Sequence, residues 1–64
     1  MNNNDRILRS EELYSMACDK KTLGEFDSAI RLFNEALNIN PDYIEALNNL
    51  GNVYVAQEKY QDAL

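Results

Sequence analysis

The chain overlays on itself when it is shifted by 34 residues, so that Glu11 falls on Glu45. Few superimposed residues are identical, but they agree in size and polarity at positions suited to burial. The pairs include Leu13 with Leu47, Met16 with Leu50, Ala17 with Gly51, Phe26 with Tyr60, Ala29 with Ala63 and Ile30 with Leu64. A self-match at a fixed period of about 20 to 50 residues is typical of repeat proteins. The chain is therefore predicted to hold one complete repeat unit and part of a second.

Local signals, independent of the repeat, predict a first helix over residues 6–23. Asn4 or Asp5 is expected to cap its amino end, and Gly24 supplies a stop at its carboxyl end. Its apolar residues follow helical spacing. They are Leu13, Met16, Ala17 and Leu23.

A second helix is predicted over residues 25–40, where apolar residues recur three and four apart and form one stripe. Pro41 cannot continue that helix, and it biases Asn40 away from helical dihedrals. The stripe comprises Phe26, Ala29, Ile30, Phe33, Ala36 and Leu37. Small residues, Ala17 in the first helix and Ala29 in the second, are expected to let the two backbones approach closely.

A third helix is predicted over residues 42–57, and residues 58–64 form either a short fourth helix or its continuation. In the second unit the place of Gly24 is taken by Glu58, among good helix formers with no breaker, which favours a continuous helix. Its predicted apolar stripe is Ile44, Leu47, Leu50, Gly51, Tyr54 and Val55.

This arrangement resembles the tetratricopeptide repeat family, whose pattern runs bulky, leucine, small, tyrosine, small, aromatic, small and proline along two antiparallel helices. One full repeat covers 10–43 and a truncated one covers 44–64. The pattern is filled by Leu13, Met16, Ala17, Ala29, Phe33, Ala36 and Pro41, then by Leu47, Leu50, Gly51, Tyr54 and Ala63. Lys20, in the tyrosine slot, is the exception. The resemblance implies an all-α solenoid fragment of about one and a half repeats over 6–64, after a frayed or disordered 1–5.

The resemblance also implies a protein–protein interaction module, in which the first helix of each pair lines a concave face for an extended peptide or partner protein. Asn49 and Asn52 are expected to hold a peptide backbone, because carboxamides both donate and accept hydrogen bonds. The alternative is that these asparagines are simply solvated. Glu11 and Glu45 also belong to the lining. The candidate peptide-binding residues are Tyr14, Cys18, Lys21, Asn48, Asn49 and Asn52.

One subtype of the family grips acidic carboxyl-terminal peptides with lysine, arginine and asparagine at fixed positions, and this sequence departs from it. Tyr14 stands where that subtype has a lysine and Cys18 where it has an asparagine; only Asn49 agrees. A receptor for acidic peptide tails is therefore disfavoured.

A second functional hypothesis is a self-associating structural element. A repeat unit cannot bury its own face, and the second unit ends at Leu64 before its covering helix is complete. We expect the chain to be either a piece of a longer array or a homodimer through the uncovered third helix. The residues proposed for self-association are Leu47, Leu50, Tyr54, Tyr60 and Leu64.

Charge and composition argue against other classes of function. Eleven acidic against six basic residues give a net charge of −5, which opposes binding to nucleic acid or anionic membranes. With no histidine and Cys18 as the only cysteine, neither a disulfide nor a metal site is expected. No catalytic residues, enzyme activity or cofactor are predicted, and a cytoplasmic location is the expected setting.

Overall fold

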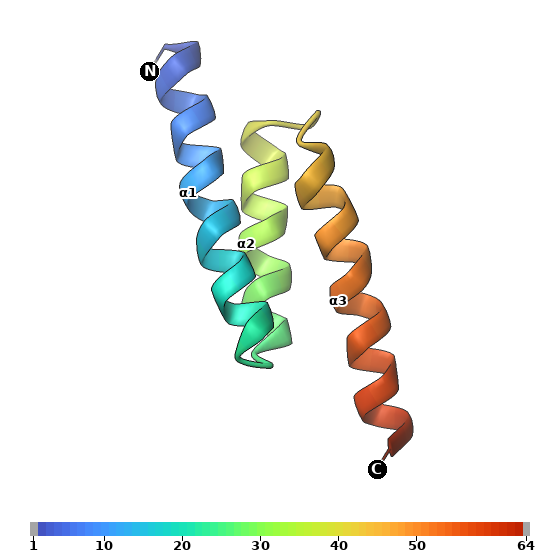
Figure 1. Cartoon of the computed structure of the whole chain (residues 1–64). Helices are drawn as coiled ribbons and strands as arrows, with labels where there is room; N and C mark the ends of the chain where they lie inside the picture. The colour runs from blue at the N-terminus through green and yellow to red at the C-terminus, as the bar shows by residue number, and fades with distance from the viewer. Residues whose placement is uncertain (1, 64) are drawn as a thin grey trace.

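The computed structural model describes the backbone of residues 2–63 and the side chains of residues 2–59. Three helices, α1 (Asn3–Thr22), α2 (Phe26–Ile39) and α3 (Ile44–Ala63), account for nearly all of this part. Each helix runs antiparallel to the one before it, α2 lies beside both α1 and α3, and α3 continues past the end of α2 (Figure 1). The predicted all-α helical-repeat fold is confirmed.

The amino end of α1 differs from the expected one. The helix begins at Asn3 rather than at residue 6, and its cap is Asn2, whose extended backbone lets its side-chain oxygen accept a hydrogen bond from the Asp5 amide at 2.8 Å. Asparagine is among the best capping residues, and Asn2 takes the place expected for Asn4 or Asp5. The residues from Asn3 to Asp5, expected to be frayed, form the first helical turn.

The turn between α1 and α2 depends on Gly24, which has a φ of +80°. Its amide donates to the Lys21 carbonyl at 3.0 Å, and the Glu25 amide donates to the Lys20 carbonyl at 2.9 Å. This pair of bonds is the Schellman motif, which ends a helix with a glycine in the left-handed conformation. The predicted turn at Gly24 is confirmed.

Small residues form the seam between α1 and α2. Ala17, Ala29, Ala36 and Phe33 are fully buried, as the repeat pattern predicts. The expectation for Met16 is wrong, because its side chain is 48% exposed and lies outside this seam. Leu23 is also exposed, since it caps the carboxyl end of α1 instead of packing within it.

The third helix packs on α2 with a different stripe from the one predicted. Its fully buried residues are Ala46 and Val53, and half-buried Leu50 lies between them at helical spacing. The predicted stripe faces largely outward. Its exposed members are Ile44, Leu47, Gly51, Tyr54 and Val55. The sequence comparison between the two repeats identified the side that a following helix would cover, and missed the side that α2 covers.

The third helix is also unbroken. It passes through Glu58 to Ala63, so the continuous form of residues 42–64, rather than a separate fourth helix, is the observed one. Residues 58 and 59 are exposed and helical, in keeping with the absence of a turn-forming residue there.

Candidate peptide-binding face

The candidate peptide-binding residues lie on one side of α1 and one side of α3. Tyr14, Cys18 and Lys21 follow each other four and three apart along α1. Asn48 and Asn49 are adjacent on α3, and Asn52 lies one turn further on. Side chains of Tyr14, Lys21 and Asn49 bridge the two helices. We call this surface the α1–α3 face.

Asn49 is the centre of the bridge. Its Nδ2 donates to the Tyr14 hydroxyl and to the Glu45 carbonyl, both at 2.9 Å, and its Oδ1 accepts from Lys21 Nζ at 2.9 Å. A carboxamide has two donor hydrogens and two acceptor lone pairs. Both donors of Asn49 are therefore used within the chain, and only one acceptor position is left for a ligand.

Asn48 and Asn52 are in a different situation. Both are exposed, and neither side-chain carboxamide makes a hydrogen bond with another described residue. Their carboxamides keep both donors and acceptors for an external partner. Cys18, on α1, is a half-buried free thiol that packs against the core.

The rings of Tyr14 and Tyr43 continue the face toward the start of α3, and the buried ring of Phe33 packs on Tyr14. The ring centroids of Tyr14 and Tyr43 are 5.0 Å apart, and those of Tyr14 and Phe33 are 5.8 Å apart. These tilted contacts lie within the range of favourable aromatic pairs. The ring of Tyr14 is thus held by packing on two sides and by Asn49 at its hydroxyl.

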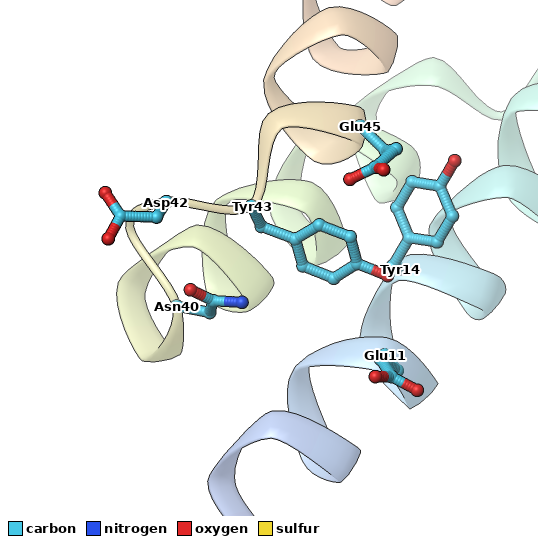
Figure 2. Close-up of a pocket in the computed structure, with 6 residues that line it drawn as sticks. All are labelled: Glu11, Tyr14, Asn40, Asp42, Tyr43 and Glu45. Carbon is cyan, nitrogen blue, oxygen red and sulfur yellow. The ribbon is translucent and has the colours of Figure 1, made fainter. Parts of the chain in front are cut away.

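Beside these rings is an open hollow of about 480 Å³ between α1, the α2–α3 turn and the first turn of α3. It is lined by Glu11, Tyr14, Asn40, Asp42, Tyr43 and Glu45. Figure 2 shows Tyr43 reaching from the turn toward Tyr14, with Glu45 and Glu11 on opposite sides of the pair. The sequence interpretation missed Asn40, Asp42 and Tyr43 as members of this surface. Pro41 could have indicated these residues, because it predicts a turn there and the turn lies beside the face.

The electrostatics of the hollow are negative. Burial raises the pKa of the Tyr14 hydroxyl above its usual value, and Cys18, Tyr43 and Glu45 raise it further. Burial likewise raises the pKa of Tyr43, with added contributions from Glu11 and Glu45. Both tyrosines are therefore neutral at physiological pH, and their hydroxyls remain hydrogen-bond donors.

The residues proposed for self-association lie on another side of α3. Leu47 and Tyr54 are 51% and 48% exposed, whereas Leu50 is half-buried against the core. The side chain of Tyr60 and the whole of Leu64 lie outside the described residues. The described part therefore leaves an apolar stripe on α3 without a neighbouring helix.

The described part of the chain lacks the features that metal binding and membrane crossing by a helix require. No group of three or more histidine, cysteine, aspartate or glutamate residues there could hold a metal ion. None of the described helices is long and apolar enough to cross a lipid bilayer.

The fold is that of helical-hairpin repeat proteins. Two antiparallel helices are joined by a turn at a glycine, and a third helix packs on the second. A family model described as TPR repeat matches residues 21–58, more than half of the chain, and the chain belongs to the tetratricopeptide repeat family. The family consists of protein–protein interaction modules, which are typically scaffolds without catalytic activity. No curated protein and no solved structure matches the chain.

Proposed function

We propose that the chain binds an extended peptide segment of a partner protein across the α1–α3 face. The backbone of the peptide is held by the free carboxamides of Asn48 and Asn52, and its side chains contact Tyr14 and Cys18. Family membership supports a protein partner. An extended peptide suits such a surface because its main-chain groups provide hydrogen bonds that do not depend on sequence.

The single observation that carries the proposal is the bridge between Tyr14, Lys21 and Asn49. Asn49 is far from Tyr14 and Lys21 in the chain, yet two hydrogen bonds between Asn49 and these residues join α3 to α1. The exposed asparagines on either side of this bridge are therefore presented on a preformed surface. A surface ordered before binding does not lose that conformational entropy on association.

We propose for Asn49 a different role from the one predicted from the sequence. Because its two donors are already used, Asn49 orders the face, and the ligand-facing carboxamides are Asn48 and Asn52. These roles can be tested by selecting extended peptides from a display library and measuring their affinities by calorimetric titration. We expect Asn48→Ala combined with Asn52→Ala to lower the affinity for the selected peptides about tenfold, because two hydrogen bonds of about 0.7 kcal/mol each are lost.

The matched control is Asn34→Ala combined with Asn38→Ala, which removes two exposed carboxamides from α2. These substitutions should leave peptide affinity unchanged. Equal weakening by both double variants, or failure of the library to give any saturable binder, would reject the α1–α3 face as the binding surface.

A second candidate function is self-association, which is favoured by the exposed apolar stripe on the unbroken α3. Leu47, Tyr54 and Val55 are each about half exposed on this helix. Burying such side chains against the same stripe of a second copy would be favourable at about 25 cal/mol per Å² of apolar surface.

Sedimentation equilibrium over a range of concentrations tests the dimer. Leu47→Glu combined with Tyr54→Glu should shift a dimer to monomer, whereas Leu8→Glu combined with Met16→Glu, at exposed apolar residues of α1, should not. A parent chain that remains monomeric at the highest concentrations would exclude this function. Helicity that rises with concentration in the absence of peptide would support it.

A further inference from the structure

We propose that the hollow beside Tyr14 and Tyr43 is a subsite for one cationic side chain of the bound peptide, with arginine preferred over lysine. The inference rests on the proposed peptide-binding function and specifies what the peptide must carry. The hollow, of about 480 Å³, lies at the α2–α3 turn, at one end of the α1–α3 face. A peptide lying across Asn48 and Asn52 would therefore reach it with a side chain near its end.

The walls of the hollow match the two parts of an arginine side chain. Two tyrosine rings, with centroids 5.0 Å apart and planes inclined by 31°, provide aromatic faces on which the guanidinium plane can stack. Carboxylates of Glu11 and Glu45, on opposite sides of the ring pair, are placed to accept its N–H groups (Figure 2). Guanidinium groups both stack on aromatic faces and form forked hydrogen bonds with carboxylates, whereas an ammonium group acts as a point charge.

Among the described residues, no cation forms an ion pair with the carboxylates of the hollow. Glu11, Asp42 and Glu45 form no ion pair with any described residue. The ion pairs of the described part, Arg9 with Glu12 and Lys20 with Glu25, lie elsewhere. An incoming positive charge would therefore gain attraction without having to displace an existing partner.

The aromatic part of the hollow is held in place before any ligand arrives. Asn49 fixes the Tyr14 hydroxyl at 2.9 Å, and Phe33 packs on the same ring. The Tyr43 hydroxyl, in contrast, makes no hydrogen bond with another described residue. It can accept a hydrogen bond from the guanidinium group of the ligand.

Other cations fit the hollow less well. The described carboxylates do not form a group that could hold a metal ion, so a compact divalent cation lacks its ligand set. A neutral side chain would leave the three carboxylates of the hollow without a counter-charge. The combination of flat rings and separated carboxylates therefore favours a long, planar cation.

The subsite can be tested directly by titrating the full chain with single amino-acid derivatives and monitoring the amide chemical shifts of the protein. N-acetyl-arginine amide should give saturable shifts at Tyr14, Tyr43 and Glu45. N-acetyl-citrulline amide has nearly the same shape without the charge, and it should bind about tenfold more weakly or not at all, since two partly exposed ion pairs are worth about that factor. N-acetyl-lysine amide should fall between the two.

Glu11→Gln combined with Glu45→Gln should lower the affinity for the arginine derivative by about the same tenfold factor, since both ion pairs are lost. The control is Glu35→Gln combined with Glu58→Gln, which changes the net charge equally at exposed residues outside the hollow. Its affinity for arginine should equal that of the parent chain. Glutamine keeps the size of glutamate, and circular dichroism would verify that both variants are folded.

Equal binding of arginine and citrulline would overturn the subsite, as would equal weakening by the two double variants. Failure of the subsite and failure of peptide binding can be told apart. If selected peptides bind the α1–α3 face and tolerate replacement of each arginine by citrulline, the subsite is wrong and the proposed function stands. If the arginine derivative saturates the hollow while no extended peptide binds, the subsite stands and the proposed function is wrong.

Discussion

The side-chain amide of Asn49 donates to the Tyr14 hydroxyl at 2.9 Å, joining helices α1 and α3 across 35 positions of the chain. The two helices otherwise meet only through α2 over most of their length (Figure 1). The relative placement of α1 and α3 is therefore set by their shared packing on α2 and by the few side chains that join them directly. Substitutions at Asn49 should act on the face as a whole.

Asn49→Ala is expected to lower the free energy of unfolding by about 1 to 2 kcal/mol relative to Asn52→Ala, because partly buried hydrogen bonds to Tyr14 and Lys21 are lost. Both substitutions replace asparagine by alanine in the same helix, so the gain in helix propensity cancels in the comparison. Urea unfolding followed by circular dichroism measures the difference. Equal stabilities would mean that the bridge contributes nothing to folding.

A larger residue in the seam between α1 and α2 should destabilise the chain. Ala29 has no exposed surface and lies in the core with Ala17 and Phe33, so Ala29→Leu is expected to cost about 1 to 3 kcal/mol through overpacking. Asn34→Leu places the same side chain at an exposed position of α2 and should cost much less. Thermal unfolding of the two variants would compare them, and an Ala29→Leu chain as stable as the parent would contradict the assigned seam.

Replacement by alanine should change the stability of the chain in opposite directions at its two glycines. Gly24 has a φ of +80°, which strains any residue with a Cβ, so Gly24→Ala is expected to destabilise the chain by about 1 kcal/mol. Gly51 lies within α3 where an added Cβ meets nothing within 4 Å. Gly51→Ala should therefore stabilise the chain by about 0.5 to 1 kcal/mol through helix propensity. Denaturant midpoints would measure both, and a destabilising Gly51→Ala would show that a neighbour approaches α3 there, as in a dimer.

Stability should fall at alkaline pH. The folded state raises the pKa of Tyr14 and Tyr43 above the usual 10.0, chiefly by burial, so it retains protons that the unfolded chain has lost. The resulting stabilisation is fully present below pH 10 and is lost as pH rises through the raised pKa values. Urea unfolding between about pH 9 and pH 12 would follow the loss. Tyr43→Phe removes one of the two groups and should make the dependence on pH shallower; an unchanged slope would exclude Tyr43 as a contributor.

The sequence predicted the parts of the fold that depend on local patterns. Recurrence at a fixed offset identified the repeat, Gly24 and Pro41 placed the two turns, and the spacing of Ala29 and Phe33 on α2 predicted the buried seam. Apart from the recurrence, which spans 34 positions, each of these signals lies within a few residues of the structure that it determines. The absence of a breaker near Glu58 predicted the unbroken α3 in the same way.

The misses have a common physical origin. Apolar residues occupy more than one side of α3, so periodicity alone does not decide whether Ala46 and Val53 or Leu47 and Tyr54 face α2. The use of both Asn49 donors depends on the register between α1 and α3, which no local pattern contains. Tyr43 joins the candidate site only because the α2–α3 turn folds its ring onto Tyr14.

The glycine turn between α1 and α2 also has a consequence for the order of folding. Two helices joined by a short turn meet through contacts between residues close in sequence, and such contacts form quickly. The bond between Asn49 and Tyr14 forms only when α3 has docked on that hairpin, and we expect it to close after the rate-limiting step. Loss of this bond should therefore accelerate unfolding and leave the refolding rate nearly unchanged. The surface proposed to meet a partner is then the last part of the chain to assemble and the first to open.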